Sequence, residues 1–307
     1  MITYYQHANA KNGLDEMETL RRGIWLRSER PTEDDADDLR NLGIDEGILS
    51  DALDPHEIPR IEHDDGWTYF ITRVPDVGDN FNDYTTPIMF ALSADYTVTV
   101  SRDLLGRLWQ PFVDQTHIGP GNQAQFFISM VEVILQSYQK RVAIINRQMR
   151  AVTSNVQRLR PSDISVIVEY ERKLNDYLDA LIPTNTALEK TISARYKLLP
   201  LNDEDQDMVE DLSVDIEQVI ARCKSLLRTI TNVRDSYRAV MDTRLNETMR
   251  VLTVVTLSVT IPTMISGLFG MNVDLPVDVH NELIFWLVVA VSFVAAVSVS
   301  MYFLRKR

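Results

Sequence analysis

Apolar residues become nearly continuous near the C-terminus of this chain. No charged side chain occurs from residue 251 to 270, and a second uncharged run covers residues 283–304. At about 1.5 Å of rise per residue, roughly twenty helical residues span the hydrocarbon core of a bilayer, which is about 30 Å thick. The pattern therefore predicts two transmembrane helices joined by a short outer loop over residues 271–282.

Basic residues beside these runs predict their orientation. Arg244 and Arg250 precede the first run, and residues 305–307 form a basic tail after the second. The loop between the runs contains acidic residues but no Lys or Arg. Because Lys and Arg concentrate on the cytoplasmic side of membrane helices, we expect both chain ends to lie in the cytoplasm and the hairpin to cross the cytoplasmic (inner) membrane.

Residues 1–121 alternate short strand-like and helix-like patterns. Thr32, followed by several acidic residues, indicates a capped helix start. The segment predicts a cytoplasmic α/β subdomain with a mixed or largely parallel sheet, ending at Gly119-Pro120-Gly121. Its expected strands are rich in β-branched and aromatic residues and cover residues 2–5, 24–27, 67–73, 87–92 and 97–101.

The chain then becomes helical in long pieces. Residues 122–200 predict a pair of long helices that meet near Pro161, with a kink at Pro183. Residues 201–250 predict a stalk helix that continues into the first span, because neither Pro nor Gly interrupts it before Pro262. A helix this continuous could transmit a tilt from the cytoplasmic part to the membrane, and Pro262 is the expected bend.

Composition narrows the range of functions. The 307 residues carry a net charge of −13, which argues against nucleic acid as a partner and makes divalent cations more natural ones. The single Cys223 excludes an intramolecular disulfide framework. A Gly-rich phosphate loop, a nucleophile elbow and an HExxH helix are all missing from the sequence, so neither an enzyme nor an organic cofactor is expected.

One face of the first span is mostly small or hydroxylated. At about 100° per residue, eight residues fall within a sector of about 120°. This face predicts either the lining of a pore or a close contact between membrane helices, where Gly, Ser and Thr are enriched. Ser258 and Ser266 lie outside the sector. The eight residues, called the polar stripe below, are Asn246, Met249, Thr253, Thr256, Thr260, Thr263, Gly267 and Gly270.

The outer end of the first span reads Phe-Gly-Met-Asn over residues 269–272. Together with the two C-terminal spans, the segment 246–253 and the Pro262-Thr263 pair, this resembles the CorA family of divalent-cation channels over most of the chain. That family has Tyr-Gly-Met-Asn at this point. Here Phe269 replaces the Tyr, Thr260 stands where a bulky apolar residue is common, and the loop lacks the Met-Pro-Glu-Leu of well-known members.

The resemblance implies a CorA-like homopentameric funnel, with five first spans around a pore and the second spans outside them. It implies transport of Mg²⁺, with Co²⁺ or Ni²⁺ as further substrates. Gly270, Met271 and Asn272 would form the selectivity filter, whose amides suit an ion that keeps its waters. The outer-loop carboxylates expected to attract cations are Asp274, Asp278 and Glu282.

The resemblance also implies a gate and a regulatory site. Met249 and Leu252 would form an apolar constriction near the cytoplasmic end of the pore. The family closes when cytosolic Mg²⁺ binds between carboxylates of adjacent subunits. Residues 43–51 align with one such segment at Asp51, and counting back along the stalk helix from Asn246 places the other carboxylate at Asp211. The alternatives are helix capping by Asp51 and surface solvation at Asp211.

Two other functions stay open from the sequence. A zinc transporter of the same superfamily shares the motif, although His280 is the only imidazole near the outer end and no His/Cys cluster offers softer ligands. A membrane-anchored scaffold would use the hairpin only as an anchor and would leave the polar stripe unexplained.

Overall fold

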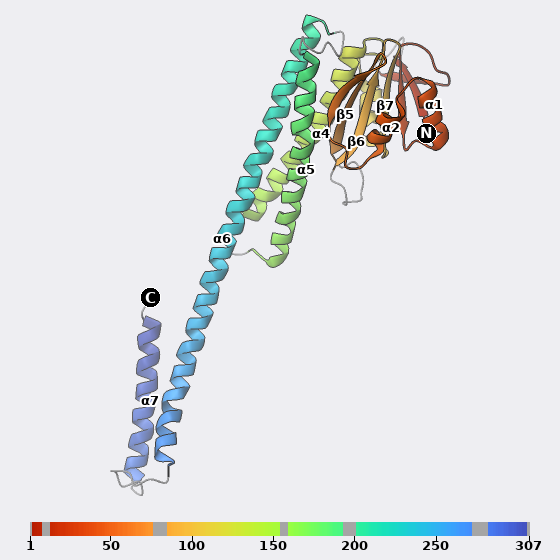
Figure 1. Cartoon of the computed structure of the whole chain (residues 1–307). Helices are drawn as coiled ribbons and strands as arrows, with labels where there is room; N and C mark the ends of the chain where they lie inside the picture. Colours follow the sequence, from red (N-terminus) through yellow and green to blue (C-terminus); the bar gives the residue numbers. More distant parts are fainter. Residues whose placement is uncertain are drawn as a thin grey trace. The chain divides into compact units, whose positions relative to one another are not determined.

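The computed structural model describes residues 2–7, 13–75, 85–153, 159–192, 201–271 and 282–305. The chain divides into two compact units, residues 1–233 and residues 234–307. The first unit contains a seven-stranded sheet and helices α1 to α5, and the second contains α7; helix α6 contributes to both (Figure 1). The α/β N-terminal part, the long helices and the two apolar C-terminal helices confirm the predicted fold class.

The sheet has the strand order β2-β1-β3-β7-β6-β5-β4 and is mixed. Only β3 and β7 pair in parallel among the strands described, so the alternative of a largely parallel sheet is wrong. The short turns from β4 to β5 and from β6 to β7 contribute to this, since such turns can join only antiparallel strands. The strands are β1 (Ile2–His7), β2 (Leu14–Met17), β3 (Ile24–Glu29), β4 (Arg60–Asp64), β5 (Trp67–Pro75), β6 (Thr85–Leu92) and β7 (Tyr96–Ser101).

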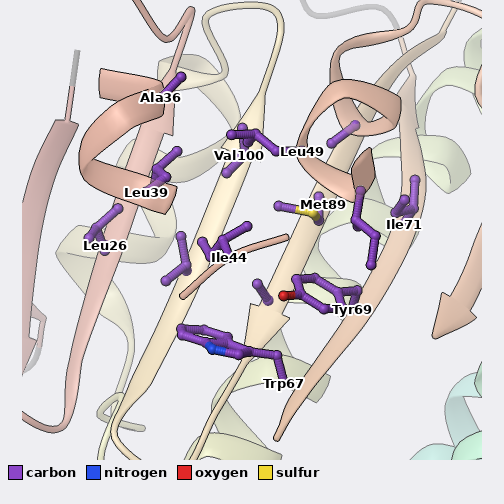
Figure 2. Packing of buried hydrophobic residues seen from close by; sticks show 14 residues of the cluster. Leu26, Ala36, Leu39, Ile44, Leu49, Trp67, Tyr69, Ile71, Met89 and Val100 are labelled. Atoms are coloured by element: carbon purple, nitrogen blue, oxygen red, sulfur yellow. The ribbon is translucent and has the colours of Figure 1, made fainter. Parts of the chain in front are cut away.

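Two short helices cover one face of the sheet. Helix α1 (Glu33–Asn41) starts at the predicted Thr32 cap, whose side chain and that of Asp35 form a capping box. Helix α2 (Glu46–Leu53) starts at Asp45, whose Oδ1 accepts a hydrogen bond from the Ile48 amide at 2.9 Å. Figure 2 shows the apolar side chains of both helices facing the strands. The strand residues of this core include Leu26, Trp67, Tyr69, Ile71, Met89 and Val100.

The opposite face of the sheet packs against longer helices. Helices α3 (Gly106–Gln115), α4 (Gln123–Thr153) and α5 (Pro161–Ile192) follow β7. Alternation along β5 places Phe70 on this face, 5.1 Å from the ring of Phe127 in α4, and Thr72 within 2.7 Å of Thr184 in α5. Because both sheet faces are covered, β5 and β6 are buried almost throughout their lengths.

Helix α6 (Asp203–Phe269) runs for 67 residues without a break, as the absence of interior Pro and Gly before Pro262 predicts. In its first part, buried residues follow one another at spacings that alternate between four and three residues, which is the period of a coiled coil. This row of buried residues is called the seam below. Ser213 Oγ, beside this seam, donates a hydrogen bond to Asn185 Oδ1 of α5 at 3.0 Å. The seam consists of Asp205, Val209, Leu212, Ile216, Val219, Cys223, Leu226, Ile230 and Val233.

We expect Cys223 to resist alkylation while the chain is folded. Its side chain has no exposed surface, and burial raises the pKa of its thiol to about 12. At neutral pH the reactive thiolate is therefore almost absent. Labelling of detergent-solubilised protein with iodoacetamide, followed by mass spectrometry, should modify Cys223 only after denaturation. Rapid labelling under native conditions would contradict the buried seam.

Candidate functional site

The surfaces of α6 and α7 near the C-terminus are suited to lipid. Both helices contain a stretch long and apolar enough to cross a membrane, and only 6% and 11% of those stretches are buried within the chain. Helix α7 (Glu282–Arg305) exposes large rings such as Trp286 and Phe293, at 67% and 70%. A core helix of a soluble protein would bury these residues instead, so a bilayer is the solvent that matches them.

Helix α7 runs beside the C-terminal part of α6 (Figure 1), and the residues through which the two helices meet are not those of the polar stripe. Ser258 Oγ and Ser300 Oγ share a hydrogen bond across the two helices. Val254 is buried one turn before Ser258, and Ser292 and Ala296 are buried on α7. Ser258 therefore lies outside the polar stripe because it belongs to the contact between the two spans.

The polar stripe lies on another side of α6. All eight of its residues are exposed in the isolated chain. At about 100° per residue, their mean direction is about 160° around the helix from that of Val254 and Ser258. A contact with α7 therefore does not account for the polar stripe. This face is left either for the lumen of a pore or for a helix of another chain.

Four threonines in the polar stripe use their hydroxyl protons in the same way. Each Oγ1 donates to the carbonyl oxygen four residues earlier, at 2.8 to 2.9 Å. The hydroxyl proton is thus directed to the helix backbone, and the oxygen lone pairs are what each side chain presents outward. These threonines are Thr253, Thr256, Thr260 and Thr263.

At the C-terminal end of α6, the structure describes Gly270 and Met271, and both are exposed. The Gly270 amide donates to the Ser266 carbonyl at 3.0 Å, and a Cβ added at Gly270 would meet that same oxygen at 3.3 Å. A Cβ at Gly267 would meet no atom within 4 Å. Three residues predicted to act here lie outside the described residues, namely Asn272, Asp274 and Asp278; Glu282 begins α7 and is exposed.

The two residues predicted to form an apolar constriction lie on the exposed surface of α6. Met249 is 53% exposed and Leu252 is 57% exposed. Asn246 precedes them on the same surface and is also exposed. This apolar pair therefore comes just before the line of hydroxyls along α6.

Asp51 lies in the last turn of α2 and does not cap that helix, because Asp45 is the N-cap. The capping alternative for Asp51 is therefore wrong. Its Oδ2 instead accepts from Arg60 Nη2 at 2.8 Å. A carboxylate near a helix C-terminus lies at the negative end of the helix dipole, so a guanidinium there stabilises it. Sequence reasoning did not assign this partner.

Asp211 is exposed on α6, five heptads before Asn246. Its neighbour Leu212 belongs to the buried seam, so the carboxylate points away from that seam. Within the described part of one chain, no three His, Cys, Asp or Glu side chains are grouped closely enough to hold a metal ion. Asp51 and Asp211 thus do not form a preassembled metal cage with a third ligand in the single chain.

Comparison with known proteins decides the family. Residues 21–307 match the family model described as CorA-like Mg²⁺ transporter protein. The chain belongs to this CorA family. Membership makes it a membrane transporter of divalent cations and not an enzyme.

Individual relatives are distant but extend along most of the chain. The chain is 24% identical to the cobalt/magnesium transport protein CorA of Methanocaldococcus jannaschii, over 93% of this chain and 90% of that protein. It is 21% identical to the cobalt/magnesium transport protein CorA of Thermotoga maritima, over 87% of this chain and 77% of that protein.

Solved structures share the fold at low identity. The complete structure of the CorA magnesium transporter from Methanocaldococcus jannaschii has a TM-score of 0.83 at 22% identity and covers 100% of this chain and 98% of its own. A full-length CmaX protein gives 0.73 at 15% identity, with 97% of both chains covered. The fold therefore extends over soluble and membrane parts alike.

The position of the polar stripe predicts a difference in water access between two residues on α6. Cysteine at Thr256 should react with a membrane-impermeant methanethiosulfonate reagent in reconstituted protein, because that face is exposed and polar. Cysteine at Ser258, which contacts Ser300, should not react. Native Cys223 is buried and adds no background. Equal labelling at both positions would refute a hydrated stripe distinct from the α7 contact.

Proposed function

We propose that this chain forms a homopentameric channel that moves Mg²⁺, and also Co²⁺ or Ni²⁺, across the cytoplasmic membrane with both termini in the cytoplasm. The exposed polar stripe on a CorA-family first span is the observation that carries the proposal. The proposed segments are a cytoplasmic α/β subdomain (1–121), a long-helix pair (122–200), a stalk (201–250), a pore helix (251–270), an outer loop (271–282), an outer span (283–304) and a basic tail (305–307).

The polar stripe favours assembly because a single chain cannot cover it. Helix α7 occupies a different side of α6, so the threonines of an isolated chain would face lipid. Two helices, each about 10 Å across, cannot enclose an aqueous path. Several copies of α6 around one axis would place every stripe toward water and every Trp286 and Phe293 toward lipid or a neighbouring chain. Family resemblance supports five copies.

The threonine geometry favours passage of a hydrated cation. Water bound to Mg²⁺ is polarised and donates strong hydrogen bonds, and Mg²⁺ dehydrates reluctantly. Because Thr253, Thr256, Thr260 and Thr263 direct their protons to the backbone, their oxygens can accept from those waters. Neutral acceptors bind the hydrated ion weakly enough to release it, as conduction requires.

At the outer end, Gly270, Met271 and Asn272 would form the filter, with Asn272 presenting a ring of amides. The close approach of the Gly270 Cβ position to the Ser266 carbonyl supports a requirement for glycine there. Carboxylates at Asp274, Asp278 and Glu282 would raise the local cation concentration. At the cytoplasmic end, Met249 and Leu252 would close the path by excluding water.

For regulation, we infer that cytosolic Mg²⁺ binds between Asp51 of one subunit and Asp211 of its neighbour and stabilises the closed assembly. Both side chains are accessible from solvent, at 50% exposure for Asp51, and Asp211 lies on the helix that continues into the membrane. A divalent ion that bridges carboxylates of adjacent subunits would hold the stalk helices together. Loss of the ion would release that constraint.

Asn272→Ala should abolish Mg²⁺ entry into proteoliposomes that contain a Mg²⁺-sensitive dye, because it removes the side-chain amides that are proposed to surround the ion in the filter. Asn41→Ala makes the same chemical change at an exposed position at the end of α1 and should leave entry unchanged. Zn²⁺ is tested in parallel. Entry of Zn²⁺ alone through the unaltered chain would reassign it as a zinc transporter, and the absence of flux of either ion would overturn the channel.

Leu252→Ser should raise the resting Mg²⁺ flux, because serine side chains around the constriction no longer exclude water from it. Val255→Ser is the matched control, because Val255 is similarly exposed, at 53%, but points about 60° further than Leu252 from the mean direction of the polar stripe. The same dye assay measures both variants. If Leu252→Ser behaves like Val255→Ser, Leu252 does not gate the pore.

A further inference from the structure

Arg60 holds three carboxylates, and one of them belongs to the proposed regulatory site. Its Nη2 donates to Asp51 Oδ2 at 2.8 Å, its Nη1 contacts Glu57 Oε1, and its Nε donates to Glu62 Oε1. The partners come from α2, from the loop after it and from β4. The three carboxylates and the guanidinium together carry a formal charge of −2, so Arg60 neutralises only one of the three negative charges.

This group is only partly open to solvent. The side chains of Arg60 and Glu57 are 27% and 16% exposed, whereas Asp51 and Glu62 are 50% and 44% exposed. Partial burial reduces screening by water and salt, so the charge of Arg60 acts more strongly on its neighbours than at an open surface. Asp51 is the most exposed member, so a cation from solution can reach it.

The pairing with Arg60 opposes binding of a second cation to Asp51. One Asp51 oxygen is engaged by the guanidinium, and the unit positive charge lies in contact with the carboxylate. A divalent ion that arrives at Asp51 meets repulsion from Arg60. When a cation replaces Arg60 at Asp51, Arg60 stays paired with Glu57 and Glu62. Its half-buried guanidinium is therefore not left without a counter-ion.

We propose that Arg60 is an internal counter-ion that competes with the regulatory divalent cation for Asp51 and thereby sets the cytosolic Mg²⁺ concentration at which the channel closes. This inference rests on the proposed regulation through Asp51 and Asp211. Arg60 acts through Asp51 and is a positioning residue, not a ligand of the ion. Removal of its charge makes the site more sensitive to Mg²⁺, whereas removal of the Asp51 charge makes it less sensitive.

The test titrates Mg²⁺ on the cytoplasmic face of excised proteoliposome patches that contain the full-length protein. Arg60→Gln should lower the half-blocking Mg²⁺ concentration by about tenfold, the effect of roughly one unit charge in contact with a divalent-ion site. Arg40→Gln is the matched control. Arg40 also contacts three carboxylates, Glu33, Asp37 and Glu46, and has 30% side-chain exposure, but it does not touch Asp51.

A double variant separates action through Asp51 from a change in overall charge. In an Asp51→Asn background, Arg60→Gln should no longer shift the half-blocking Mg²⁺ concentration, because the carboxylate for which Arg60 and the cation compete is gone. Arg60→Lys keeps the charge with fewer hydrogen bonds and should give a smaller shift than Arg60→Gln. It also keeps the test informative if Arg60→Gln folds poorly. The Mg²⁺ dependence of the thermal melting midpoint of the full-length protein provides a second readout.

The possible outcomes are distinct. A tenfold shift seen for Arg60→Gln but not for Arg40→Gln, and lost in the Asp51→Asn background, supports the inference. If the unaltered chain closes with Mg²⁺ and Arg60→Gln does not change the half-blocking concentration, the role of Arg60 is refuted while the regulation stands. If the unaltered chain conducts Mg²⁺ but shows no closure by cytosolic Mg²⁺, the proposed regulation and this inference both fail.

Discussion

The continuity of helix α6 is the constraint on which the other features depend. The first part of its 67 residues packs in a protein core that is surrounded by water, and the last part must suit a bilayer. A helix satisfies its own backbone hydrogen bonds in both solvents, and side chains alone then determine what each face contacts. One face buries the coiled-coil seam from Asp205 to Val233, another carries Val254 and Ser258 toward α7, and the polar stripe is exposed. That exposed face is what makes the single chain incomplete as a membrane protein.

Much of this arrangement could be predicted because its signals are local. The length of the uncharged runs predicts the spans, and the lack of Pro and Gly between residues 203 and 261 predicts one continuous helix. The Thr32 cap and the central strands follow from side-chain chemistry and β-branched runs. The strands that escaped prediction, β2 and β4, lie at the two ends of the sheet order. Such edge strands are polar on one side and give a weak hydrophobic pattern, as Leu-Asp-Glu-Met shows.

What the sequence did not reveal depends on contacts between distant residues. Ser258 and Ser300 are 42 residues apart, so their hydrogen bond follows only from the packing of the two spans. Arg60 reaches Asp51 because the chain turns between α2 and β4, and a separation of nine residues matches neither helix nor strand periodicity. The resemblance to the CorA family suggested Asp51 as a metal ligand, but only the structure shows that a cation from the same chain already contacts it.

The account depends most on one claim, that several copies of α6 place their threonines around a common axis. Cryo-electron microscopy of the full-length protein in lipid nanodiscs with Mg²⁺ tests this directly. The predicted map has five copies, with Thr253, Thr256, Thr260 and Thr263 facing a central path and α7 forming the outer ring. A map in which α7 lines the axis, or in which the threonines pack against another helix without a path between them, would contradict the account.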